Sequence, residues 1–150
     1  MSGFGQEALA GSLFAHWSDN FPLAVTTVYP GTQIDAAGLS EWLEIWINAW
    51  QRDPRRSAGK EQVDVSVTVH CFVERTLDKG RILELADAAK STLEHQQVSV
   101  TDQSLSDPPV VGHLQLFETQ TRTMTRRDRD AGRHGLQHVV LVTAGVATEV

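Results

Sequence analysis

Residues 63–73 read VDVSVTVHCFV, and this stretch decides the fold. Apolar residues occupy every second position and mostly polar residues lie between them, which is the period of a β-strand with one buried and one wet face. The run is also longer than the five or six residues of an ordinary strand. We therefore expect a long strand whose valine-rich face, with Cys71 as a small buried hydrophobe, packs against a helix.

Two helices are expected. The one that would cover this strand spans about residues 79–94, after Asp78 as a suitable N-cap. Its apolar positions recur with the helical period: Ile82, Leu85, Ala86, Ala89 and Leu93. The other helix spans residues 6–18 and carries Leu9, Leu13 and Trp17 at i, i+4 and i+8.

Alternation predicts further strands at residues 97–101, 111–124 and 136–143, while 22–40 is expected to be irregular and 144–150 a loosely held tail. Together these elements predict one α+β domain over residues 1–150. We expect a mixed, mostly antiparallel sheet of about four to five strands with two helices packed on one face.

Residues 41–50 fit two patterns. Leu39, Leu43, Trp46 and Trp50 would form a helical stripe with Ser40 as its N-cap, yet apolar residues also alternate as in a strand. The β-branched and aromatic content favours the strand. A strand would place Trp42, Trp46 and Trp50 on one sheet face, as a large apolar strip that needs cover from a helix or a partner.

Composition narrows the functional classes. The chain has 150 residues, 41% of them hydrophobic, and a net charge of −6, which argues against bulk binding to nucleic acid. The first residues, MSGFGQEALAG, lack the features of a signal peptide, and no apolar run reaches membrane-spanning length. We expect a protein of the cytoplasm that does not interact with membranes.

We expect no catalytic, cofactor-binding or metal site, and hence no enzyme. The phosphate-loop patterns GxGxxG and GxxxxGK[ST] and the zinc pattern HExxH do not occur in the sequence. One cysteine excludes an intramolecular disulfide. His134 and His138 have i, i+4 spacing, but Gly135 between them breaks the helix that this spacing would need. His70 and His113 are interpreted as residues of polar strand faces.

Two basic clusters stand out, one at Arg52, Arg55, Arg56 and Lys60, the other at Arg126, Arg127, Arg129 and Arg133. They are either solvated hairpin ends, whose positive charge is partly offset by nearby aspartates, or a pair of adjacent loops. In the second case they would contact an acidic protein surface or face DNA that passes without being read.

Several segments in this order resemble the tail-terminator (tail-completion) proteins of long-tailed bacteriophages. VYPGTQID at 28–35 is followed by WLEIWI at 42–47, Arg55-Arg56-Ser57 and VDVSVTVHCFV. Lys79-Gly80 then precedes LELADAAKSTL, and VSV at 98–100 leads to two closing strands. The resemblance covers about residues 21–143. The chain departs from the family pattern at Glu44, where a basic residue is common, and in its threonine-rich stretch at 119–125.

The resemblance implies a structural protein of the virion's tail or neck, assembled in the host cytoplasm. It would form a ring, a homohexamer in this family, on the tail tube protein, end tube polymerisation and present the surface that the head-neck stopper or connector protein joins. The tryptophans and the two basic clusters would then lie at ring, tube or neck contacts, and DNA would only pass through the channel. The alternatives are another neck or tail component, such as a tube or head-completion protein, and a small-ligand-binding domain or enzyme whose tryptophans line a pocket.

Overall fold

The computed structural model describes residues 4–33, 38–51, 60–74, 79–124 and 136–150. Neither helix in these ranges has the length and apolar character that a membrane crossing requires. The elements in chain order are α1 (Gln6–Asn20), β1 (Thr27–Val28), β2 (Glu41–Gln51), β3 (Gln62–Glu74), α2 (Lys79–Leu93), β4 (Gln97–Thr101), β5 (Val110–Thr123) and β6 (Leu136–Glu149).

The six strands form one sheet in the order β1-β2-β3-β6-β5-β4. Every neighbouring pair is antiparallel except β1 and β2. The mixed, mostly antiparallel sheet is therefore confirmed, with six strands instead of the expected four to five. The additional strand is β1, whose two residues are too few to produce an alternating pattern.

Residues 41–50 are a strand, because β2 pairs with β3 along its whole length, from Glu41 opposite Val73 to Gln51 opposite Val63. The long strand β3 lies near the middle of the sheet and also pairs with β6 along its full length. The regular pattern of β3 arises because one of its faces is buried in the core along the whole strand, while the other face is more exposed.

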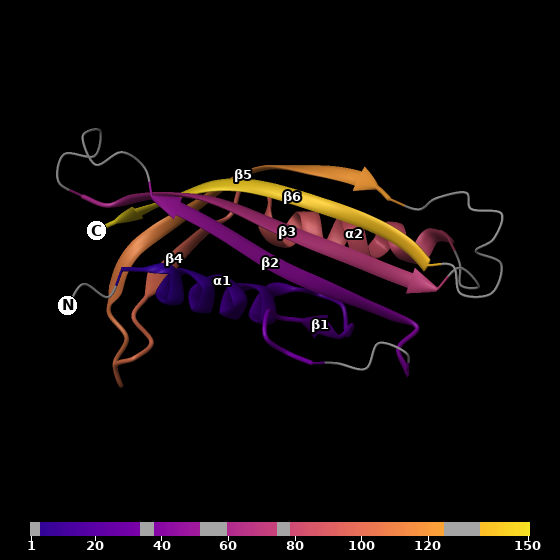
Figure 1. Cartoon of the computed structure of the whole chain (residues 1–150), viewed down its shortest axis with the longest axis horizontal. Helices are drawn as coiled ribbons and strands as arrows, with labels where there is room; N and C mark the ends of the chain where they lie inside the picture. The colour runs from indigo at the N-terminus through magenta and orange to yellow at the C-terminus, as the bar shows by residue number, and fades with distance from the viewer. Residues whose placement is uncertain (1–3, 34–37, 52–59, 75–78, 125–135) are drawn as a thin grey trace.

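Both helices pack on one face of the sheet, as expected (Figure 1). Val67 on β3 and Leu85 on α2 have no exposed surface and belong to the same core cluster. Cys71 is buried there as well, and burial raises the pKa of its thiol to about 12, so the thiolate is disfavoured at neutral pH. The predicted packing of the valine-rich face against α2 is confirmed.

Helix α1 connects the two edges of the curled sheet, lying between β4 and β1 in Figure 1. On one side the backbone N–H of Thr101 in β4 donates a 2.9 Å hydrogen bond to the Ser12 hydroxyl. On the other side the indole N–H of Trp17 donates to the Thr27 hydroxyl of β1 at 3.0 Å. The buried Leu9, Leu13 and Trp17 stripe therefore fills the concave side between the edges.

The tail expected to be loose is instead the second half of β6. Ala147 has no exposed surface and pairs with Val63 on β3 and Leu114 on β5. Small residues such as Gly145 and Ala147 gave little hydrophobic signal, but they fit here because β5 and its leucines approach β6 closely. A Cβ on Gly145 would lie 2.8 Å from the Gln115 carbonyl oxygen.

Candidate functional site

The sheet face opposite the helices carries the second set of alternating side chains. On β2 this set includes Trp42, Glu44, Trp46 and Trp50, and their direct partners on β3 are Phe72, His70, Thr68 and Asp64. We call this surface the outer face. Both helices of the described chain pack on the other face, so the outer face presents side chains of several strands together.

Three aromatic rings stack in a row across the outer face. The centroids of Trp42 and Phe72 lie 4.8 Å apart and those of Phe72 and His138 lie 4.4 Å apart, with 18° between the planes in both pairs. They come from the adjacent strands β2, β3 and β6 at matching register positions. Such offset stacking fixes each ring and leaves Trp42 at the end of the row nearest the sheet edge.

His138, at one end of this row, also pairs with a second histidine, His70. His70 Nδ1 and His138 Nε2 are 2.9 Å apart, a hydrogen bond in which one imidazole donates and the other accepts. Burial lowers the pKa of His138, as does the proximity of His70, and both effects outweigh the opposing influence of the Glu44 carboxylate. The sequence predicts His70 on a polar strand face but not its pairing with His138, because alternation does not reveal which strands are neighbours.

The three tryptophans share the outer face, as predicted, but differ in exposure. Trp42 is only 7% exposed because Phe72 covers it, which corrects the expectation of a uniformly exposed strip. Trp46 and Trp50 are 46% and 52% exposed. Val142 lies in the same row as Trp46, with Thr68 between them, and is also exposed. The exposed apolar part of this face is therefore centred on β2 and extends toward β6.

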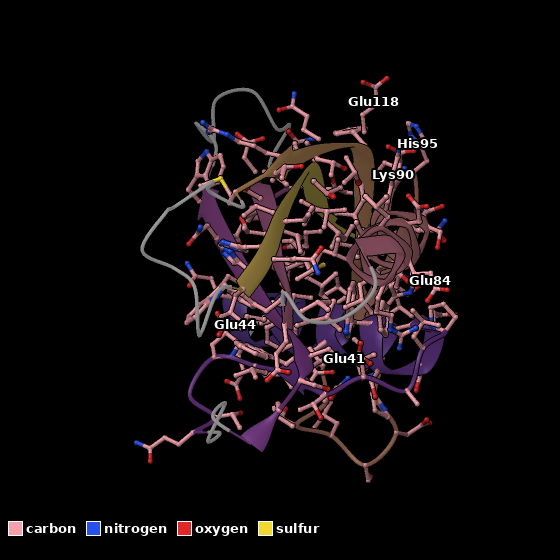
Figure 2. All side chains as sticks on the ribbon, turned by 90° about the vertical axis from the view of Figure 1, so that its right-hand side faces the viewer. Glu41, Glu44, Glu84, Lys90, His95 and Glu118 are labelled. Atoms are coloured by element: carbon pink, nitrogen blue, oxygen red, sulfur yellow. The ribbon has the colours of Figure 1, made fainter. Side chains whose placement is uncertain are left out.

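A surface hollow of about 320 Å³ lies where the outer face meets β1 and the residues after it. Its walls are Val28, Tyr29, Gly31, Thr32, Gln33, Trp42, Glu44 and Trp46. The Glu44 carboxylate accepts a 3.4 Å hydrogen bond at Oε1 from the indole N–H of Trp42. In Figure 2 Glu44 lies on the side of the sheet away from α2, whereas Glu41 of the same strand lies toward the helix.

This hollow differs from the apolar cavity that the ligand-binding alternative requires, which would be ringed by all three tryptophans. Trp50 does not line it, and a carboxylate does. In the described ranges, no group of three or more histidine, cysteine or carboxylate residues could hold a metal ion.

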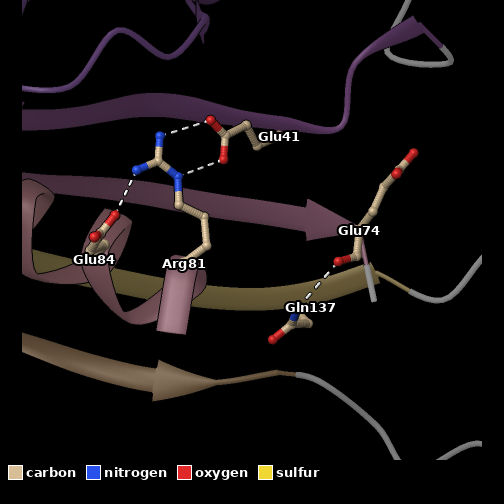
Figure 3. A network of polar contacts seen from close by, with 5 residues as sticks. All are labelled: Glu41, Glu74, Arg81, Glu84 and Gln137. Atoms are coloured by element: carbon tan, nitrogen blue, oxygen red, sulfur yellow. Dashed lines mark hydrogen bonds and ion pairs between the residues drawn. The ribbon is translucent and has the colours of Figure 1, made fainter. Parts of the chain in front are cut away.

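On the helix-covered side, Arg81 joins α2 to β2 (Figure 3). Its guanidinium donates to both carboxylate oxygens of Glu41, at 2.8 and 2.9 Å, and to Glu84 at 2.6 Å. The hydrogen bonds from Arg81 lower the pKa of the Glu41 carboxyl against the opposing effect of burial. This bidentate pair fixes the start of β2 and so helps to position the outer-face side chains that follow it.

Of the predicted basic residues, Lys60 is described and exposed. Arg52, Arg55, Arg56, Arg126, Arg127, Arg129 and Arg133 lie outside the described residues. The strands that flank these two segments are described, and the strand ends next to one segment lie far from those next to the other. β3 begins at Gln62 opposite Thr148 and ends at Glu74 opposite Leu136, where β6 begins. The two segments are thus attached at opposite ends of the sheet, roughly 40 Å apart, and the expectation of adjacent loops is wrong for their points of attachment.

Comparison with known proteins adds the fold alone. A solved protein chain with 12% sequence identity superposes with a TM-score of 0.64, covering 98% of this chain and 97% of its own length. The sequence matches no protein-family model and no curated protein.

Proposed function

We propose that this chain is a tail-terminator protein of a long-tailed bacteriophage. It would form a ring at the head-proximal end of the tail tube, stop tube polymerisation and provide the surface to which the head-neck protein binds. The proposal starts from the resemblance of residues 21–143 to that family. The observation that carries it is the outer face, where Trp46 and Trp50 are about half exposed, while the helices pack against the opposite face of the sheet.

An unpaired sheet edge beside these tryptophans supports assembly with further copies. The backbone N–H of Leu43 points toward β1, where it binds the Thr26 carbonyl, so Ile45 and Ile47 present their backbone groups to the same side. β1 ends at Val28 opposite Glu44, and no described strand pairs with β2 beyond that point. Open strand edges pair readily with other chains.

A second open edge lies on the other side of the molecule. Thr121 and Thr123 pair with β6 along one edge of β5, but β4 pairs with β5 only as far as Gln115. Among the described residues no strand therefore lies beside the other edge of β5 at Thr121 and Thr123. Two different open edges on one subunit suit a head-to-tail contact, in which one edge meets the other edge of the next copy. Such contacts close into rings when the rotation between copies allows it.

Electron microscopy of phage particles assembled without this protein tests the proposal. Overlong tails are the expected result, because nothing would stop tube growth. Headless tubes of normal length would instead indicate another neck or tail component, such as a head-completion protein. Negative-stain images of the concentrated purified protein are expected to show rings, and their central hole and symmetry give the ring size directly.

A further inference from the structure

The open edge of β2 presents a defined set of backbone groups. The N–H of Glu74 in β3 donates to the Ser40 carbonyl, so even-numbered residues of β2 bond to β3 and odd-numbered ones point away from it. The Ala49 carbonyl on this edge is occupied, since it accepts a 3.4 Å hydrogen bond from the Gln6 side chain. Among the described residues, no strand pairs with the remaining groups, which are the Ile45 carbonyl, both groups of Ile47 and the Ala49 N–H.

The open edge of β5 presents a matching set. The N–H of Met124 donates to the His138 carbonyl of β6 at 2.8 Å, so even-numbered residues in this part of β5 bond to β6 and odd-numbered ones point away. The Thr119 N–H is occupied, because it donates to the Glu94 carboxylate at 2.9 Å. In the described ranges, no strand pairs with the remaining groups, which are the Thr119 carbonyl, both groups of Thr121 and the Thr123 N–H.

The two occupied groups select one alignment of these edges. In an antiparallel pairing with Ala49 opposite Thr119, the Thr119 N–H and the Ala49 carbonyl would face each other, and both already have partners. Each remaining donor then meets an acceptor: Ala49 donates to Thr119, Ile47 and Thr121 exchange two hydrogen bonds, and Thr123 donates to Ile45. A shift by two residues would place an occupied group opposite an unoccupied one and lose a hydrogen bond.

Strand direction agrees with this alignment. Each of the neighbouring pairs β2-β3, β3-β6 and β6-β5 is antiparallel, so β2 and β5 of one subunit run in opposite directions. Rotation about an axis that runs roughly along the strands preserves these directions. The β5 edge of one copy would therefore meet the β2 edge of the next copy in the antiparallel sense.

The side chains on the outer face also agree. Thr119 and Thr143 share a buried hydrogen bond on the core side, so Arg122 of β5 lies on the outer face and is exposed. In this alignment it would lie opposite Trp46 of the next copy and diagonal to Glu44. A guanidinium is attracted both to an exposed indole and to a carboxylate.

We propose that a second copy of this chain adds its β5 edge to the β2 edge, with Thr121 opposite Ile47, so that one antiparallel sheet continues from subunit to subunit. The inference rests on the proposed ring and specifies the contact that would build it. Within one subunit Arg122 lies in the same row as Glu44, whereas across the contact it lies opposite Trp46. The next copy is therefore displaced by two residues, and a sheet that closes on itself requires such a stagger.

Cysteine pairing tests this contact in the purified protein. Asn48 and Gln120 are both exposed, are separated by β3 and β6 within one subunit, and would lie directly opposite each other across the contact. Asn48→Cys with Gln120→Cys is expected to form a ladder of disulfide-linked oligomers under mild oxidation. Asn48→Cys with Met124→Cys is the matched control, because Met124 is also exposed but would lie about 13 Å further along the strand. Cys71 is buried and is present in both variants.

A backbone variant tests the hydrogen bonds themselves. Thr121→Pro removes one N–H of the proposed ladder at an edge position, where a strand tolerates proline. It is expected to weaken self-association by about tenfold or more, measured by sedimentation, with a melting temperature close to that of the unmodified protein at low concentration. Thr121→Val keeps the N–H and is expected to associate like the unmodified protein.

The proposal is overturned if the control pair cross-links as readily as the pair at 48 and 120, or if folded Thr121→Pro associates with unchanged affinity. If Thr121→Pro does not fold, the cysteine pairs decide alone. Rings in electron micrographs without the expected cross-link would overturn this contact and leave the tail function standing. Cross-linked oligomers together with tails of normal length in particles lacking the protein would support the contact and overturn the tail function instead.

Discussion

His70 on β3 and His138 on β6 share a hydrogen bond of 2.9 Å between their ring nitrogens, although 68 positions separate them in the chain. The pair lies against the ring of Phe72, with Glu44 directly opposite His70 on β2. On the β6 side, Val140 pairs with His70 and separates it from Arg122 on β5. The imidazoles therefore form a hydrogen-bonded contact inside a partly buried aromatic cluster.

This contact predicts that acid destabilises the protein in the range where histidine titrates. The pKa of His138 in the folded state is below its ordinary value of 6.5, so the unfolded chain binds more protons as the pH falls. The stabilisation is complete above the unfolded pKa and is lost as the pH falls through the folded one. Urea unfolding between about pH 8 and 5 is expected to show this loss, and His138→Gln to flatten the pH profile. An unaltered slope in the variant would contradict the assignment.

A charge in the core is expected to prevent folding. Val67 has no exposed surface, so Val67→Asp would bury a carboxylate among the side chains of the helices and should abolish soluble expression. Ser66→Asp is the matched control, because the neighbouring side chain points to the outer face and can remain solvated. Soluble Val67→Asp protein with an unchanged melting temperature would refute the core assignment.

The ion pair between Arg81 and Glu41 is expected to stabilise the fold modestly. Its side chains are 31% and 22% exposed, so Arg81→Gln should reduce the free energy of unfolding at pH 7 by about 1 kcal/mol or less. Because Arg81 lowers the pKa of Glu41 below its usual 4.5, this stabilisation is present above that pH and is lost as the pH falls through the folded value. Denaturant unfolding at pH 7 and pH 3 should show a smaller difference between the two proteins in acid than at neutral pH. Glu84→Gln is the control for the more exposed partner, and its effect should be smaller.

The exposed tryptophans are expected to contribute to self-association. Replacing Trp46 and Trp50 by Ser should weaken association, measured by sedimentation at rising concentration, with little change in melting temperature. Trp42→Ser should instead lower the melting temperature, because Trp42 is stacked on Phe72 and nearly buried. An assembled ring in which Trp46 and Trp50 lie away from every contact between subunits would contradict this prediction.

The two arginine segments are expected to act separately. Arg55→Glu with Arg56→Glu, and Arg126→Glu with Arg127→Glu, should leave folding intact, since solvated loop charges contribute little to stability. Each double variant is expected to slow the joining of phage heads to phage tails at low salt. The joining rate with the unmodified protein should itself fall as salt rises. The strands that flank the two segments end at opposite ends of the sheet. We therefore expect one double variant to slow docking to the tail tube and the other to slow docking to the neck protein. Joining rates equal to the unmodified protein at low salt would identify both segments as ordinary solvated ends.

The sequence alone predicted the α+β class, the two helices, and the alternation that separates the core face from the outer face. These features depend on local periodicity, and β3 shows it most clearly because every second side chain along it is buried in the core with the helices. The same local signal failed at β1 and at the end of β6. Two residues carry no period, and glycine and alanine contribute to a close sheet contact without adding hydrophobicity.

Only the tertiary structure decided which side chains meet on the outer face. Strand order places β6 between β3 and β5, so His138 contacts His70 and Phe72. It also places β1 beside β2, so Tyr29 lines the same hollow as Trp42 and Glu44. Alternation along a strand indicates the face to which each side chain points, but it does not indicate which other strand lies beside that strand. That choice depends on how the helices and the long strands bury one common core, which is a property of the whole chain.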